Sequence, residues 1–317
     1  ISPRKWRALL KEAAGDSLNV TVSALEGRIW KEYRPFSWYV ASEAIDPVLS
    51  YRLIEPGYEV WSRISICQRD LGNFRERKLI DNNLIDDGCV NCHICRQQDP
   101  SRSFFHLRHA GGGTMVQQDG KFRKINTSTD STISAGVYGN WHPSGKYIAF
   151  STNVIIPEFH SIRNKRLEVY DTISDLIVLD LERNKVITSR VIAEKGSFES
   201  FPVFSADGSS LYFCSAHALR MPAEYDKVRY SLCSVSFDPA DGSFGSIADT
   251  LISAERTGRS ISHPKPSPNG KKLMFTSIAY GNFPVWHEEA DLCLLDPATG
   301  KIDTLPAVNS RRSDSYH

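Results

Sequence analysis

An excess of charge of either sign is what this sequence most clearly lacks. Its 317 residues include 38 Lys and Arg against 37 Asp and Glu, a formal net charge of +1. This balance gives no electrostatic reason to expect nucleic acid or an anionic membrane as partner. The sequence also has no apolar run approaching the roughly 18–20 residues of a membrane span. We therefore expect no membrane span, while a lipid anchor stays open.

Two catalytic signatures are missing as well. Residues 111–113 are a run of glycines, but no Gly-Lys-Ser or Gly-Lys-Thr follows, which excludes a phosphate loop. No Gly-x-Ser-x-Gly elbow is present, so nothing supports a serine hydrolase. An initiating Met is absent too, and a removed leader or a trimmed chain would each explain the start at Ile1.

Cysteine is sparse, and its spacing gives no disulfide framework. Three of the seven cysteines lie within seven residues of one another, and four are scattered. The scattered ones occur in apolar, strand-like surroundings, where a lone cysteine packs as a small hydrophobe. We therefore expect core packing for Cys67, Cys214, Cys233 and Cys293.

A repeated strand–turn–strand pattern is what the sequence does contain. Each copy combines a strand, a turn on Pro-Ser-Gly, Ala-Asp-Gly or Pro-Asn-Gly, and a strand of alternating apolar residues. The copies are 140–151, 201–213 and 263–275, and a second hairpin follows each at 175–180, 231–236 and 291–296. Four short strands per repeat are typical of a propeller blade.

These repeats are longer than ordinary blades because each contains an insert. Gly145, Gly208 and Gly270 lie 63 and 62 residues apart, against roughly 40–50 residues per blade. The excess falls between the second and third strands, at 152–174, 216–230 and 278–290. We expect these inserts to be irregular and to emerge on one rim of the ring.

Weaker copies of the pattern precede the three clear ones. The chain divides into a half blade near 18–32 and blades near 36–80, 95–127, 138–193, 200–250 and 262–306. We predict an all-β fold, with a helical segment over 1–17 (its helix at 3–14) and one six-bladed β-propeller domain over 18–317. The closing strands are either absent at the C-terminal end or supplied in another way.

The Pro-x-Phe/Trp-Ser-x-x-Gly repeats resemble those of TolB-like β-propellers, well over 95–317 and weakly over 18–80. This resemblance implies a bacterial, extracytoplasmic binding platform, located in the periplasm or at the cell surface. Such a platform binds a partner protein or a small ligand. We expect this chain to be a monomer.

A Cys-x-x-Cys-His motif lies outside the repeat, in the expected connector over 81–99. It resembles the haem-attachment site of c-type cytochromes. The resemblance implies that Cys89 and Cys92 are thioether anchors of haem c and that His93 is the proximal iron ligand. The candidate sixth ligands are Met115, His106 and His109.

Two other chemistries fit the same cysteines. Zinc needs four ligands, which Cys89, Cys92, His106 and His109 supply, with Cys95 as a spare. A strand would, however, point the two histidines to opposite faces. The third alternative is a disulfide, Cys89–Cys92 or Cys92–Cys95, that braces the connector without any cofactor.

Aromatic and histidine side chains recur in the three inserts. Such side chains on adjacent loops suit a ligand or a partner protein, and packing of the long loops explains them equally well. The adjacent acidic pair Glu288 and Glu289 is expected to be solvated. The predicted binding face consists of His160, His217, Tyr225, Phe283, Trp286 and His287.

Three functional hypotheses follow. The preferred one is an extracytoplasmic propeller that binds a partner on the inserts and carries a c-type haem for electron transfer or redox sensing. The second is a haem-free scaffold that binds a protein or ligand and whose clustered cysteines form a disulfide. The third is a metal-dependent enzyme with its site on the inserts, and we favour a role without catalysis.

Overall fold

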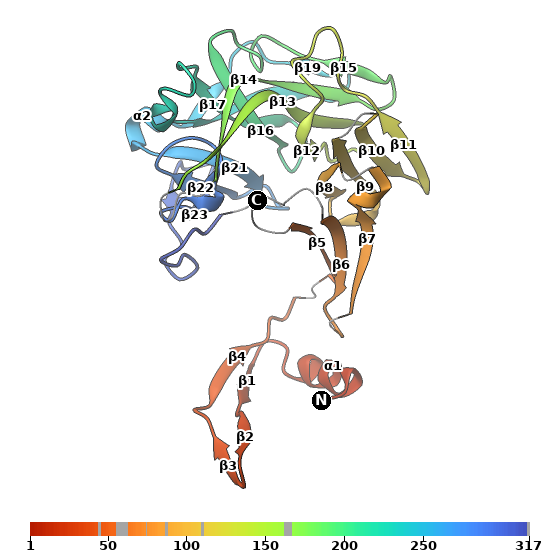
Figure 1. Ribbon diagram of the computed structural model, residues 1–317, viewed down its shortest axis with the longest axis vertical. Helices are drawn as coiled ribbons and strands as arrows, with labels where there is room; N and C mark the ends of the chain where they lie inside the picture. Colours follow the sequence, from red (N-terminus) through yellow and green to blue (C-terminus); the bar gives the residue numbers. More distant parts are fainter. Residues whose placement is uncertain are drawn as a thin grey trace. The chain divides into compact units, whose positions relative to one another are not determined.

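A computed structural model describes residues 1–43, 46–54, 63–73, 75–85, 88–108, 111–161 and 167–315 (Figure 1). The chain divides into two compact units, Ile1–Val90 and Asn91–His317, and each is described by itself. The predicted single domain over 18–317 stays a prediction. Among the helices of these residues, none is long and apolar enough to cross a membrane.

The first unit begins with the predicted helix, α1 (Pro3–Glu12). Ser2 caps it by accepting a hydrogen bond from the backbone N–H of Lys5, and proline occupies the first helical position, where its missing N–H costs nothing. The strands that follow are β1 (Ser17–Val20), β2 (Ser23–Glu26), β3 (Ile29–Glu32), β4 (Phe36–Tyr39), β5 (Val48–Ile54), β6 (Ile64–Asp70) and β7 (Glu76–Asp81), then the 3-10 turn η2 (Asn82–Ile85).

Strand pairing in this unit differs from the prediction. We expected 36–42 to be the second strand of a blade over 36–80. Instead β4 pairs with β1, β2 pairs with β3, and the remaining sheet has three strands in the order β5-β6-β7. The residues of the half blade expected near 18–32 are therefore divided between two short ribbons, β1 with β4 and β2 with β3.

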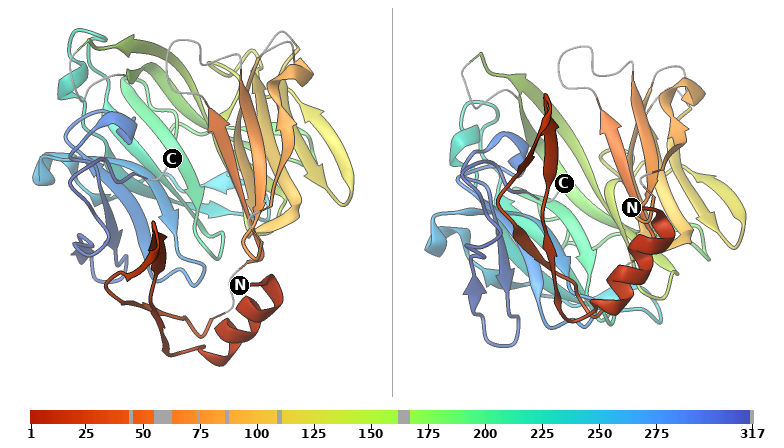
Figure 2. Two further views of the ribbon diagram at one scale, coloured as in Figure 1. Left: turned by 60° about the horizontal axis from the view of Figure 1, so that its bottom comes forward. Right: turned by 90° about the horizontal axis from the view of Figure 1, so that it is seen from below.

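The second unit contains four successive antiparallel sheets, which follow the colour order of the sequence in Figures 1 and 2. The sheets comprise β8 (Cys89–Arg96), β9 (Asp99–Arg108), β10 (Gly113–Gln118) and β11 (Lys121–Ile125); β12 (Val137–Trp141), β13 (Tyr147–Phe159), β14 (Leu167–Asp180) and β15 (Lys185–Ile187); β16 (Ser197–Phe204), β17 (Ser210–His217), β18 (Ser231–Asp238), β19 (Ser243–Phe244) and β20 (Asp249–Ile252); and β21 (Ser260–Pro266), β22 (Leu273–Ile278), β23 (Asp291–Leu295) and β24 (Ile302–Asp303). A one-turn helix, α2 (Ala254–Thr257), precedes the last of them.

The second and third sheets are joined by one parallel pairing, Ser174 with Phe198. No sheet among the described residues closes on itself into a ring, so six blades stay a prediction. The strand–turn–strand pattern itself is confirmed. Gly145, Gly208 and Gly270 have φ of 78°, 80° and 70°, the left-handed conformation that these tight turns require.

A bulge recurs in the first strand of each sheet. Cys92, Tyr138, Phe201 and His263 all have positive φ, between 49° and 53°. The pairing register shifts at the last three of these positions. Such a bulge re-aims a side chain, and it marks the same place in every repeat.

The first insert differs from the prediction, which was an irregular loop. β13 and β14 continue past the sheet and stay paired to Phe159 and Leu167, so residues 152–159 and 167–174 form two extended, paired strands. Alternating β-branched residues favour this outcome, as in Val154, Ile156 and Ile173. The other two inserts are irregular, with the short turns η3 (Tyr225–Lys227) and η4 (Pro284–Trp286).

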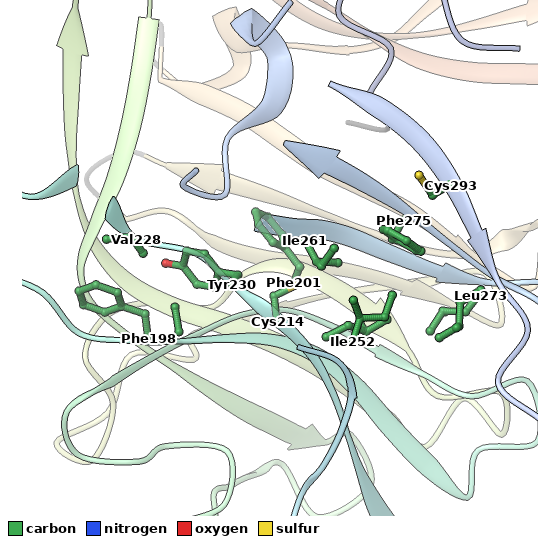
Figure 3. Close-up of a cluster of buried hydrophobic side chains, with 13 residues drawn as sticks. Phe198, Phe201, Cys214, Val228, Tyr230, Ile252, Ile261, Leu273, Phe275 and Cys293 are labelled. Atoms are coloured by element: carbon green, nitrogen blue, oxygen red, sulfur yellow. The ribbon is translucent and has the colours of Figure 1, made fainter. Parts of the chain in front are cut away.

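Buried side chains from consecutive sheets form the core of the second unit. One cluster, drawn in Figure 3, combines Phe198 and Cys214 of the third sheet with Phe275 and Cys293 of the fourth. Burying one such phenylalanine stabilises the fold by roughly 1.5–3 kcal/mol. The four scattered cysteines are all buried, which confirms their predicted core packing.

Candidate functional site

The Cys-x-x-Cys-His residues lie within a strand, not in a connector. Cys89–Arg96 is β8, the first strand of its sheet, so the connector predicted over 81–99 is wrong for these residues. Cys92 occupies the same bulge position as Tyr138, Phe201 and His263 in the next three sheets. The Cys-x-x-Cys-His motif is therefore part of the first strand of a repeat, and Cys92 lies where the other three repeats have their bulge.

The bulge residues also meet one another. The backbone N–H of Tyr138 donates to Cys92 Sγ at 3.4 Å. The Tyr138 ring lies 4.9 Å from that of Phe201, and the Phe201 ring stacks on His263 at 3.9 Å. The bulges thus bring one residue from each of the four sheets into contact. We call Cys92, Tyr138, Phe201 and His263 the central cluster.

These surroundings do not fit a covalently attached haem. Cys89 is only 6% exposed, and the Cys92 sulfur accepts a backbone hydrogen bond inside the central cluster. A haem bonded to both sulfurs would have to displace Tyr138 and the buried neighbours of Cys89. His93 is half-buried on the same strand.

The predicted sixth ligands are not brought to one place. His106 pairs with Thr114 across β9 and β10, so the next residue on β10, Met115, points to the opposite face. His106 is 3% exposed, its Nδ1 lies 3.1 Å from Thr114 Oγ1, and burial lowers its pKa to about 4. The third candidate, His109, lies outside the described residues.

The zinc alternative stays a prediction, because one of its four ligands, His109, lies outside the described residues. Within the described ranges, no group of three or more His, Cys, Asp and Glu side chains is arranged to hold a metal ion. None of the seven cysteines, all of which are described, takes part in a disulfide.

The first and third inserts meet at one buried carboxylate, Glu168 of β14. Tyr280 of the third insert donates a hydrogen bond to Glu168 Oε1 at 2.6 Å. His160 Nε2 of the first insert lies 3.8 Å from the same oxygen, and His287 Nε2 of the third lies 3.6 Å from Oε2. We call the surface that these inserts build the insert face.

Tyr225 of the second insert completes the convergence. Its ring centre lies 4.7 Å from that of Tyr170, 5.6 Å from that of Tyr280 and 6.0 Å from that of His160. The structure therefore brings His160, Tyr225 and His287 of the predicted binding face together, while the rim of a ring stays a prediction.

His287 is held as a cation between two carboxylates. Burial alone would lower its pKa, but its interactions with Glu168 and Glu289 outweigh burial and raise the pKa to about 9. The hydrogen bond from His287, 3.0 Å long, lowers the pKa of Glu289 to about 2. Glu289 was expected to be solvated; it is partly exposed but acts as a partner of His287.

A second buried carboxylate, Asp171, lies three residues further along β14. It accepts hydrogen bonds from Asn282 at 2.6 Å, Asn153 at 2.8 Å and Tyr230 at 3.0 Å. Burial raises its pKa and outweighs these hydrogen bonds, which lower it. Asp171 therefore links the first insert to the other two, through Tyr230 of the second and Asn282 of the third.

The remaining predicted residues lie around this network. His217 is exposed at the end of β17, opposite Ser197. Trp286 is half-buried in η4, and Phe283 lines a small pocket beside Glu168, Asp171 and Tyr225. The free volume of that pocket, about 10 Å³, is that of roughly one water molecule. The insert face is consequently a filled surface, better suited to contact than to enclosure.

No protein-family model and no curated protein matches this chain. Similar solved structures include a TolB-type protein from Agrobacterium tumefaciens, with 15% identity over 73% of this chain and 84% of that one, and a TM-score of 0.34. An oligogalacturonate lyase in complex with manganese has 14% identity over 73% of this chain and 54% of that one, TM-score 0.38.

A third similar structure is the acylaminoacyl peptidase of Pyrococcus horikoshii. It has 12% identity over 82% of this chain and 38% of that one, with a TM-score of 0.43. This chain therefore spans about half or less of the lyase and the peptidase. These similarities are too low to say anything about the activity of this chain, whose described residues are mostly β.

Proposed function

We propose that this protein is a haem-free, non-catalytic propeller-type scaffold that binds a partner protein or ligand on the insert face. The observation that carries the proposal is that inserts from three consecutive repeats meet: the first and third at the carboxylate of Glu168, and the second through the ring of Tyr225, which packs against both. A shared network of this kind fixes the loops relative to one another, and a rigid, preorganised surface loses little entropy on binding.

Exposed apolar side chains on the first insert support a contact surface. Val154 and Ile173 face each other across the hairpin and are 46% and 54% exposed. Phe159 near the hairpin tip is 49% exposed. Apolar residues beside a rigid polar network are typical of protein interfaces.

Position-specific photo-crosslinking in the source cell tests this proposal. A photoreactive residue at Val154 and, separately, at Ile173 should give the same adduct, because the two positions are neighbours. Ile247, which is 77% exposed and lies outside the insert face, is the control. Equal yields from all three positions, or different adducts from the first two, would contradict binding at the insert face.

Absence of haem is the second part of the proposal, and it makes a spectroscopic prediction. Co-expression with a c-type haem maturation system should give protein without a Soret band that survives denaturation. The reason is that Cys89 is buried and that the Cys92 sulfur accepts a hydrogen bond from the backbone of Tyr138. A band that persists in wild type and disappears in Cys92→Ser would overturn this and restore the haem hypothesis.

The location is proposed from the repeats. Their resemblance to TolB-like propellers supports a periplasmic or cell-surface location in a bacterium. Fractionation of the source cells, with a cytoplasmic enzyme as marker, tests it.

A further inference from the structure

The N-terminal segment, residues 1–39, exposes an unusual amount of apolar side-chain surface. Monomeric soluble proteins rarely leave large contiguous apolar patches uncovered. Its large side chains that are at least 40% exposed are Ile1, Val22, Leu25, Ile29, Trp30, Tyr33, Phe36, Trp38 and Tyr39. Five of these nine are aromatic.

The ribbon formed by β1 and β4 has one apolar and one polar face. In the pairing register, Leu18 lies opposite Trp38 and Val20 opposite Phe36. The rings of Phe36 and Trp38 lie 5.3 Å apart, edge to face, and these two residues are 41% and 51% exposed. The other face carries Asn19, whose amide oxygen accepts a hydrogen bond from Ser37.

The hairpin of β2 and β3 adds a second exposed apolar pair. Leu25 lies opposite Trp30, and the two are 55% and 70% exposed. A two-stranded hairpin on its own is marginally stable in water. A surface that covers these side chains would therefore stabilise both ribbons.

Helix α1 has the amphipathic pattern of a membrane-surface helix. Trp6, Leu9 and Leu10 fall on one side at helical spacing, and none of the ten helical residues is buried. The other side carries the basic residues Arg4, Lys5, Arg7 and Lys11. The helix is tied to the end of the ribbon by a backbone hydrogen bond from Gly15 to Val40.

Charge is concentrated in this segment although the chain as a whole is balanced. Residues 1–39 contain seven Lys and Arg against four Asp and Glu. A second copy of the chain would bring the same positive excess to the same surface, so like charges would oppose pairing there. The complementary surface is negatively charged.

We infer that residues 1–39 bind the surface of an anionic lipid bilayer. Trp and Tyr prefer the headgroup level, Leu and Phe reach the acyl boundary, and Lys and Arg pair with lipid phosphates. Each basic residue near such a surface adds to the attraction. The segment lies on the bilayer without crossing it.

Vesicle co-sedimentation of the full chain tests this inference. We expect binding to vesicles of phosphatidylcholine with phosphatidylglycerol, weakening as salt rises, and much weaker binding to phosphatidylcholine alone. The double variant Leu25→Ser/Trp30→Ser should reduce affinity by about tenfold or more, since it removes two exposed apolar side chains. Phe122→Ser on β11, where Phe122 is 59% exposed, is the matched control and should bind like wild type.

Charge reversal supplies an independent variant at positions that are exposed in α1. Arg4→Glu/Lys5→Glu should abolish the preference for the anionic vesicles. Absence of sedimentation with either vesicle would overturn the inference. So would equal binding by wild type and both variants, or a concentration-dependent dimer that Leu25→Ser/Trp30→Ser dissolves, which would make a second copy the occupant.

Discussion

Replacing Gly208 by alanine should destabilise the protein by about 2–4 kcal/mol. Gly208 has φ of 80°, where a Cβ costs roughly 1–2 kcal/mol. A Cβ built there would also collide with His142 Nε2, which lies 3.1 Å from the Gly208 carbonyl oxygen. The hydrogen bond that links the second sheet to the third would then be lost, at about 1 kcal/mol.

Gly300→Ala is the matched control for this prediction. Gly300 has φ of 70°, but a Cβ there meets nothing within 4 Å, so only the backbone cost of roughly 1–2 kcal/mol applies. Urea unfolding of both variants measures the difference. Equal losses would mean that the contact between sheets contributes nothing measurable to stability.

The turns and strands of the later repeats were predictable because their signals are local. A glycine in a tight turn and alternating apolar residues on either side depend only on near neighbours in sequence. The same logic failed in the first unit. Phe36–Tyr39 has a strand-like pattern, but no local signal says whether its partner is Ser17–Val20 or a later strand.

The position of Cys92 could also have been predicted by counting. Tyr138, Phe201 and His263 each lie seven residues before the turn glycine of their repeat, and Cys92 lies seven before Asp99. This correspondence is not obvious in the sequence, because the turn that follows Cys92 contains no glycine. Gln97 and Gln98 take the left-handed conformation there instead, with φ of 46° and 65°.

Of the six residues predicted for the binding face, three lie together in the network around Glu168. The sequence analysis assigned no role to Glu168 or Asp171. Histidine and tyrosine in the inserts signalled a shared surface, and His160 and Tyr225 are indeed part of it. Glu168 and Asp171 were missed because the first insert was expected to be irregular. If the first insert had been predicted as a strand, its side chains would have been expected to alternate between two faces. Burial of Glu168, however, depends on Tyr280, which lies 112 residues later in the sequence.

His287 should make the stability of the protein fall as pH rises above neutrality. Its pKa is raised from 6.5 to about 9 in the folded protein, so its contribution is fully present below about pH 6.5 and is lost as pH rises through about 9. A shift of this size corresponds to about 3 kcal/mol. Glu289 has a pKa lowered to about 2, so the stability that its carboxylate contributes is lost only at pH values far below this window.

The variant His287→Leu isolates this effect. It should cost about 3 kcal/mol at pH 7, because Glu168 is only 4% exposed and loses one of the two histidines beside it. Its stability between about pH 6.5 and 9 should then decline less steeply than that of the wild type, because only the decline that buried Glu199 causes in both proteins, with its pKa raised to about 8, is left. Urea unfolding across this range measures both curves, and His217→Leu, at the exposed end of β17, should follow the wild type. Parallel curves for wild type and His287→Leu would show that His287 is neutral in the folded protein. The inserts would then be held by packing of Tyr225 and its neighbours and not by a cation between carboxylates.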